Sequence, residues 1–226
     1  MSTLSNNACN NYSVSIYMEL HRLVVSGGLD SRTRTTESEL AARLGTSRTP
    51  IREALQRLQG DDLIVAEGRG VKVKTMPIDE LEDLFTARAG LEGWAVFQAA
   101  TRVQEGAVPP VHLAELDALA DQADFHTRAG DIERAAFANR TFHERAAGLS
   151  ENRTVGLTLT QWWDRTIVST RHTIRTPQRA DQVDHEHHLI LDALRKGDAI
   201  AARDAAQAHV LATRDALITF NGGNPS

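Results

Sequence analysis

Polar side chains on three predicted helices have types and spacings that suit metal binding. Asn139 and His143 are four residues apart on an otherwise apolar helical face, so both side chains point inward together. His187 and His209 lie in the apolar stripes of two later helices. Imidazole suits Zn²⁺, Ni²⁺ and other first-row ions, and packed helices can bring such ligands to one point. The pattern indicates either a metal site with Asn139 as oxygen ligand or three hydrogen-bonded core histidines.

Two arginines and two hydroxyl residues lie at the start of another predicted helix. Ser47, Arg48, Thr49 and Arg52 surround Pro50, which suits a first helical turn. Arginine suits bidentate contact with guanine, while hydroxyls and helix N-terminal amides suit phosphate. The segment therefore predicts contact with DNA. The alternative is a solvated face on which Ser47 or Thr49 only caps the helix.

Arg88 is a charged residue on a face that is otherwise apolar. It shares this face with Leu81 and Phe85 and precedes Glu92 by one helical turn. A buried guanidinium needs a partner, because an unpaired charge is costly to remove from water. Two interpretations stay open: Arg88 holds a small carboxylate ligand, or it forms an internal ion pair with Glu92.

Residues 13–76 have the element order of a winged helix-turn-helix domain. The predicted elements are a helix from Val14 to Gly27, a short helix from Thr36 to Gly45, a helix from Ser47–Pro50 to Gly60, and strands at residues 63–65 and 71–73. The strands enclose a glycine turn with Gly68 and Arg69 at its tip, where Arg69 can reach the minor groove or the backbone of DNA.

Residues 77–220 contain helical patterns and no credible strand, which predicts an all-helical bundle. The expected helices span residues 79–104, 110–129, 131–148, 152–176, 178–195 and 198–219. The predicted fold is thus mainly α, with a winged head and a helical bundle. Residues 1–12 are polar and are expected to form a disordered leader, and residues 221–226 a flexible tail.

Composition and charge narrow the class of protein. One cysteine among 226 residues excludes an intramolecular disulfide and fits the cytoplasm. The sequence has neither an apolar run long enough to cross a membrane nor a signal peptide. Ten Lys/Arg and eight Asp/Glu in residues 1–75 leave this part positive, whereas the net charge of the whole chain is −5. A polyanion such as DNA would therefore meet the N-terminal part first.

The run SRTPIREALQRL at residues 47–58, followed by a G-x-G turn, resembles the DNA-binding domain of the GntR family of bacterial transcription regulators. The resemblance covers residues 13–75. It implies that the DNA-contacting positions are Ser47, Arg48, Thr49, Arg52, Gly68 and Arg69. Family members usually have arginine where this chain has Ser38, so one expected contact is missing or displaced.

The bundle resembles the FCD ligand-binding domain of the FadR subfamily of these regulators. The resemblance rests on four segments: Arg88-x-x-x-Glu92, Asn139-Arg-Thr-Phe-His143, Glu186-His187, and Gly197-Asp198 up to His209. It implies a carboxylate effector held by Arg88 beside a metal, Zn²⁺ or Ni²⁺, on Asn139 and the three histidines. Metal-binding members have Asp where this chain has Asn139, and a neutral amide is a weaker ligand.

Together these features predict a homodimeric regulator, expected to be a repressor, that binds a pseudo-palindromic operator and responds to a small carboxylate. In one alternative the metal ion is itself the effector. In another, the histidines form the centre of a helical metalloenzyme. The segment His143-Glu-Arg-Ala-Ala147 counts against the enzyme, because Ala147 stands where a zincin motif has its second histidine.

Overall fold

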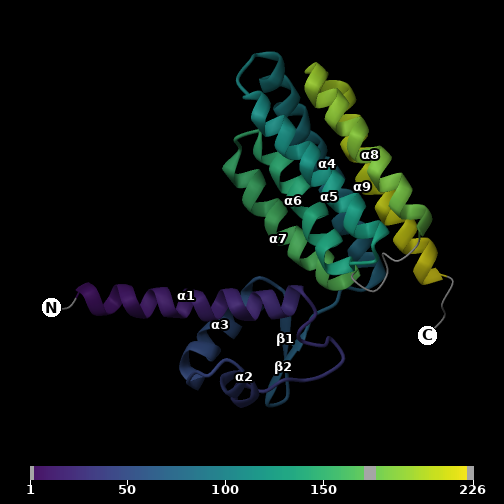
Figure 1. Cartoon of the computed structure of the whole chain (residues 1–226). Helices are drawn as coiled ribbons and strands as arrows, with labels where there is room; N and C mark the ends of the chain where they lie inside the picture. The colour runs from purple at the N-terminus through teal and green to yellow at the C-terminus, as the bar shows by residue number, and fades with distance from the viewer. Residues whose placement is uncertain (1–2, 171–176, 223–226) are drawn as a thin grey trace. The chain divides into compact units, whose positions relative to one another are not determined.

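The computed structural model describes the backbone of residues 3–170 and 177–222, and side chains within residues 14–131, 133–170 and 182–219. The chain divides into two compact units, Met1–Met76 with Ile167–Ser169, and the remainder from Pro77. The first contains α1 (Thr3–Val25), α2 (Glu37–Arg43), α3 (Arg48–Gly60), β1 (Ile64–Glu67) and β2 (Gly70–Val73) (Figure 1). The second is built from α4 (Ile78–Gln104), α5 (Pro110–Arg128), α6 (Ile132–Gly148), α7 (Arg153–Thr170), α8 (Pro177–Lys196) and α9 (Ala199–Gly222).

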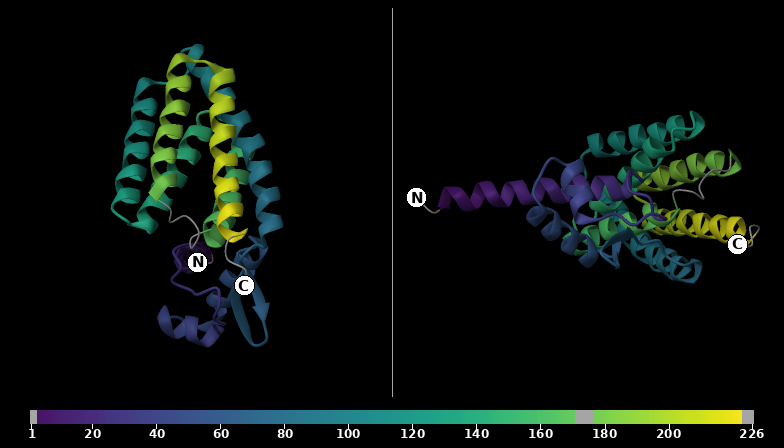
Figure 2. Two further views of the ribbon diagram at one scale, coloured as in Figure 1. Left: turned by 90° about the vertical axis from the view of Figure 1, so that its right-hand side faces the viewer. Right: turned by 90° about the horizontal axis from the view of Figure 1, so that it is seen from below.

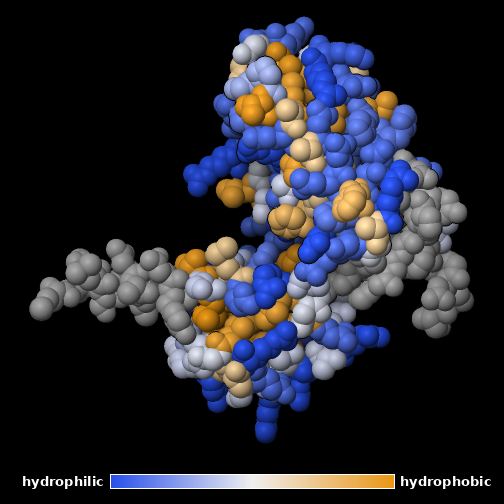
Figure 3. All heavy atoms as spheres, viewed as in Figure 1, coloured by the Kyte–Doolittle hydropathy of each residue, from blue (hydrophilic) through white to orange (hydrophobic). Residues whose placement is uncertain are grey.

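The N-terminal unit is a winged helix-turn-helix, which confirms the predicted fold. The apolar stripes of its helices meet in a small core that includes Leu20, Leu40 and Ile51. Helix α2 begins with a capping box, in which the Thr36 hydroxyl accepts from the Glu39 backbone N–H and the Glu39 carboxylate accepts from the Thr36 backbone N–H. In Figure 3 the edge of this unit that carries α2 and the hairpin tip is strongly hydrophilic.

Helix α1 begins at Thr3, so residues 3–12 of the segment predicted as a disordered leader are helical in the structure. Leu20 and Val24 anchor the helix in the core. Residues 3–13 contain neither glycine nor proline. Extending an existing helix requires no new nucleus, so the helix continues through this polar segment.

The β-hairpin that follows α3 forms the wing, residues 64–73. Glu67 pairs with Gly70, so the turn consists of Gly68 and Arg69 alone, and both strands extend further toward the tip than predicted. Gly68 has φ +59°, a left-handed conformation that glycine adopts without strain. A Cβ on Gly70 would lie 2.5 Å from the carbonyl oxygen of Thr35, which pairs with the neighbouring residue of β2. Both glycines of the G-x-G sequence therefore have a structural role.

The C-terminal unit is the predicted all-helical bundle. Helix α4 packs along α9, and α5 packs against α6 and α8 (Figure 2). Its largest core cluster includes Leu116, Phe142, Ile190 and Leu191. The helix ends agree with the predicted ones to within a few residues, except that the predicted helix 152–176 ends at Thr170 and its last six residues lie outside the described part. None of the described helices is long and apolar enough to cross a membrane.

Candidate DNA interface and candidate metal centre

The N-terminus of α3 presents the residues that the sequence assigns to DNA. Ser47 is the N-cap residue with extended backbone, yet its side chain makes no capping hydrogen bond. Ser47, Arg48, Thr49 and Arg52 are all exposed. The Ser47 hydroxyl therefore does not cap the helix by a hydrogen bond, and its contact with DNA stays a prediction. The first turn of α3 offers hydroxyl groups, guanidinium groups and backbone N–H groups to a partner in solution.

Glu37 on α2 orients both arginines of this surface. The Arg52 Nε and Nη2 donate to its two carboxylate oxygens at 3.0 and 2.9 Å, and the Arg48 Nη2 lies 3.4 Å away. These arginines, Arg52 above all, hold the pKa of Glu37 below its usual value. The side chains of Arg48 and Arg52 are 63% and 58% exposed, so their outer N–H groups stay accessible.

The tip of the wing supplies the other predicted DNA contacts. Gly68 and Arg69 are exposed. The side chain of Arg34 lies close to Gly68, with its Nη1 3.3 Å from where a Cβ on that glycine would lie. Arg34 is therefore a further cation at the wing that the sequence patterns did not single out. Ser38, where relatives usually have arginine, is exposed on α2.

The three inward histidines of the bundle converge into one cluster, although they come from α6, α8 and α9. Their ligand nitrogens all lie within 4.8 Å of one another. His143, His187 and His209 are 5%, 0% and 3% exposed. The Nε2 atoms of His143 and His209 are 3.0 Å apart. Two nitrogens bound to one ion at about 2.1 Å each would be separated by roughly this distance.

Carboxylates on the far side of two imidazoles set the chemistry of this cluster. Nδ1 of His143 lies 2.9 Å from Glu92, and Nδ1 of His209 lies 2.7 Å from Glu186. A carboxylate favours a proton on the imidazole nitrogen that faces it, which leaves both Nε2 atoms as lone pairs pointing at each other. Two lone pairs 3.0 Å apart repel unless a proton or a cation lies between them. The donor set therefore fits a divalent transition metal.

Asn139 is the predicted oxygen ligand of this set. It precedes His143 by one helical turn, and its Oδ1 is buried with no hydrogen bond from any residue that the structure describes. A buried carbonyl oxygen without a donor is costly, and a metal ion would satisfy it. The structure thus brings His143, His187 and His209 together, and Asn139 as their fourth ligand stays a prediction.

Arg88 forms the internal ion pair that was one of its two predicted roles. Its Nε and Nη2 donate to one oxygen of Glu92 at 2.8 and 2.7 Å, and its Nη1 donates to Thr166 at 3.2 Å. The guanidinium also lies 3.8 Å from the centre of the Trp163 ring. Burial alone would raise the pKa of Glu92, but the charges of Arg88 and His143 outweigh it and lower the pKa to about 2. Glu92 therefore joins the arginine to the histidine cluster.

Two family models match this chain in the same order as the two units. Residues 13–73 match "Bacterial regulatory proteins, gntR family", and residues 83–212, more than half of the chain, match "FCD domain". The chain belongs to the GntR family of bacterial regulators. It is therefore a DNA-binding transcriptional regulator with an FCD domain.

Individual relatives agree with this assignment. The GntR-family chain is 34% identical over 179 residues to the "Nta operon transcriptional regulator" of Aminobacter aminovorans, covering 75% of this chain and 78% of that one. It is 28% identical over 204 residues to the "Probable D-xylose utilization operon transcriptional repressor" of Paenarthrobacter nicotinovorans, covering 88% and 86%. The solved structure of E. coli McbR/YncC superposes with a TM-score of 0.80 at 25% identity, covering 94% of this chain and 98% of that one.

Sequence reasoning missed the acidic residues that position both sites of this GntR-family protein. Glu37 was seen only as part of a short helix, and Glu186 only as the neighbour of His187. Both act across elements, Glu37 from α2 to α3 and Glu186 from α8 to α9. For Glu37 a signal was available, because an acid at the start of α2 lies beside the start of α3 in a helix-turn-helix.

Proposed function

We propose that this regulator is a repressor that binds its operator as a homodimer and is released or recruited by a small carboxylate effector. The names of relatives support repression, since one is a xylose-operon repressor and another, from Bacillus licheniformis, is a gluconate operon transcriptional repressor. Two winged heads in one dimer would read two half-sites about one helical turn of DNA apart, or a multiple of that. Ser47, Arg48, Thr49, Arg52, Gly68 and Arg69 are the proposed contacts. Chromosomal DNA as target places the protein in the cytoplasm.

The observation that carries the effector site is the pair of Nε2 atoms facing each other at 3.0 Å, each backed by a carboxylate. Asn139, His143, His187 and His209 would hold a Zn²⁺ or Ni²⁺ ion there. The ion would supply a Lewis acid that attracts a carboxylate oxygen. In such a regulator these residues would have no catalytic role.

Arg88 is the proposed protein partner of the effector carboxylate. It lies one helical turn from Glu92, which itself bonds to His143, so an anion beside the cluster would be within reach of this arginine. Such a ligand would have to share the guanidinium with Glu92, which now engages its Nε and Nη2. Binding would thereby change the partner of Glu92 and shift the packing of α4.

A second candidate is a regulator for which the metal ion is itself the effector. In the structure Glu92 and Thr166 already accept from all three nitrogens of the Arg88 guanidinium, while the histidine cluster is preformed. An ion would therefore bind with less rearrangement than a carboxylate. The two candidates differ in which ligand changes the affinity for operator DNA.

Elemental analysis combined with DNA binding tests the proposal. Protein purified without chelator should contain about one Zn²⁺ or Ni²⁺ per chain, and His187→Ala should lose it. His185→Ala is the matched control, because His185 is exposed on the same helix. If wild-type protein reconstituted with either ion retains no metal after dialysis, the histidines form only a polar core. Operator affinity measured with metal alone and with metal plus succinate separates the two candidates.

A further inference from the structure

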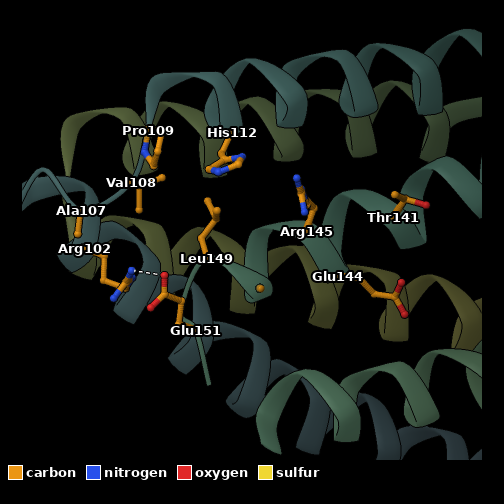
Figure 4. Close-up of a pocket in the computed structure, with 11 residues that line it drawn as sticks. Arg102, Ala107, Val108, Pro109, His112, Thr141, Glu144, Arg145, Leu149 and Glu151 are labelled. Atoms are coloured by element: carbon orange, nitrogen blue, oxygen red, sulfur yellow. Dashed lines mark ion pairs between the residues drawn. The ribbon is translucent and has the colours of Figure 1, made fainter. Parts of the chain in front are cut away.

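The C-terminal unit has a pocket with charged walls, of about 440 Å³, away from the histidine cluster. Helices α4, α5 and α6 and the loops after α4 and α6 line it (Figure 4). Arg102 is 14 residues beyond Arg88, or about 20 Å further along α4. The lining residues of α6, among them Arg145, lie on a different face of that helix from His143. This pocket is therefore separate from the proposed effector site.

Arg102 has an incompletely used guanidinium edge. Its Nη2 pairs with one oxygen of Glu151 at 2.5 Å, whereas its Nε is buried and no described residue accepts a hydrogen bond from it. Arg52 and Arg88 use the same Nε–Nη2 edge fully, each on one carboxylate group. A carboxylate placed squarely on the Arg102 edge would accept from both nitrogens. The present partner leaves the inner donor unsatisfied.

Glu151 is a partner that a ligand can readily displace. Its backbone has φ +56°, a left-handed conformation that is unfavourable for a residue with a side chain. Its side chain is 70% exposed, against 27% for Arg102. It follows α6 in a short loop and pairs with Arg102 at the edge of the pocket, as the dashed line in Figure 4 shows. Glu151 thus occupies the arginine edge from a strained and solvated position.

The rest of the pocket suits an organic anion. His112 and Arg145 point toward each other from α5 and α6 on the side away from Glu151 (Figure 4), and both contact Glu115. Val108 and Leu149 supply an apolar surface between the two charged ends. Pockets of this volume commonly hold small metabolites, with few polar groups that fix orientation.

From these contacts we propose that this pocket binds a small organic carboxylate, which replaces Glu151 on the Nε–Nη2 edge of Arg102. The carbon skeleton lies against Val108 and Leu149, and a second acidic group is directed to Arg145 and His112. The site is independent of the proposed effector site, because it shares no side chain with Arg88 or the histidine cluster.

Calorimetric titration of the full-length protein with succinate, and separately with inorganic phosphate, tests this site. Arg102→Gln should weaken succinate binding at least about tenfold, because it removes a charge-assisted pair. Arg102→Lys should also weaken it, because lysine keeps the charge and lacks the planar edge. Arg128→Gln is the matched control, an exposed arginine on α5 paired with Asp124, and should bind as wild type does.

Glu151→Gly is the decisive variant, because it tests the pocket in a protein that should remain folded. Glycine suits the left-handed backbone, so this protein should be at least as stable as wild type and should bind succinate several-fold more tightly. Unchanged affinity in Glu151→Gly, or full binding in Arg102→Gln, would overturn the proposal. Tighter binding of phosphate than of succinate would overturn the assignment to a carboxylate. Loss of binding in His187→Ala with retention in Arg102→Gln would place succinate at the histidine cluster and also refute this site.

Discussion

Single carboxylates hold the groups of both candidate sites in place. Glu37 accepts hydrogen bonds from Arg48 and Arg52 of α3, and Glu92 contacts both Arg88 and His143. Each carboxylate fixes a cation or an imidazole that a ligand is expected to use. A ligand at either site must therefore share its donor groups with a carboxylate of the protein or displace that carboxylate. This competition weakens ligand binding, but the carboxylate keeps the donor groups oriented.

Arg52 is expected to carry specific DNA binding. Arg52→Ala should lower operator affinity at least about fivefold, since a bidentate arginine contact contributes about 1–3 kcal/mol. Its side chain is exposed, so the melting temperature should stay unchanged. Fluorescence anisotropy with labelled operator measures the effect. Arg128→Ala gives the same change in net charge in the C-terminal unit, and an equal loss of affinity there would show that Arg52 acts only through net charge.

Glu37 is expected to restrain binding to arbitrary DNA. Glu37→Gln removes a negative charge from the surface that faces phosphates and frees Arg48 and Arg52 from their ion pairs. Affinity for non-operator duplex should rise about threefold or more, with a steeper dependence on salt. Salt titrations on a scrambled duplex measure this change, with Glu133→Gln on α6 as the charge-matched control. If Glu37→Gln leaves the affinity for the scrambled duplex and its salt dependence unchanged, the ion pairs of Glu37 persist in the wild-type complex with DNA.

At the scale of elements, the approach of α4 to α9 determines whether the histidine cluster can form. Helix α4 carries Glu92, and α9 carries His209. Between them lies Gly93, where a Cβ would be 2.5 Å from Cγ of Gln207 on α9. A glycine in mid-helix costs stability relative to alanine, so its presence at this contact is explained by the close approach of the helices.

Two alanine substitutions in α4 should therefore have different effects. At Gly90 a Cβ meets nothing within 4 Å, so Gly90→Ala should raise the free energy of unfolding by up to about 1 kcal/mol through helix propensity. Gly93→Ala gains the same propensity but must displace Gln207, and should be less stable than Gly90→Ala by about 1 kcal/mol or more. Urea denaturation of both variants measures the difference. If both variants are stabilised equally, Gln207 on α9 moves away from the added methyl group without a loss of stability.

The sequence predicts the helices well because each has an apolar stripe of helical period and recognisable ends. The capping box at Thr36 and the glycines of the wing belong to such local signals. Pairs of side chains on different elements are harder to predict from the sequence. Glu186 and His209, for example, are 23 residues apart, and only packing brings them together. The helical start of α1 was missed because its first residues are polar, and burial patterns give no signal there.

At the scale of the whole molecule, a ligand in the C-terminal unit can change DNA affinity only if it binds the DNA-competent and incompetent states differently. Such couplings amount to about 1–3 kcal/mol, or roughly 5–150-fold in affinity. Metal, effector and DNA must then influence one another reciprocally. This reciprocity is checked by measuring how metal changes the affinity for operator DNA and how operator DNA changes the affinity for metal.

Metal should stabilise the folded protein if the cluster binds it. At a free concentration about 100 times the Kd, the gain is about 2.7 kcal/mol, which corresponds to a rise of about 5–10 °C in Tm for a protein of this size. Differential scanning calorimetry with Zn²⁺ or Ni²⁺, before and after addition of EDTA, measures the shift. His185→Ala should show the full shift and His187→Ala none; a shift of equal size in both variants would place the metal elsewhere.

The most direct measurement is binding of the purified protein to the DNA just upstream of its own gene, at several salt concentrations, with and without EDTA. We expect specific, salt-sensitive binding that Arg48→Ala and Arg52→Ala strongly weaken, with an affinity that changes when the metal is removed. Specific binding that both arginine variants retain would contradict the assignment of α3 as the DNA-reading helix. Specific binding that is indifferent to EDTA, in protein shown to contain metal, would contradict the coupling of the histidine cluster to DNA.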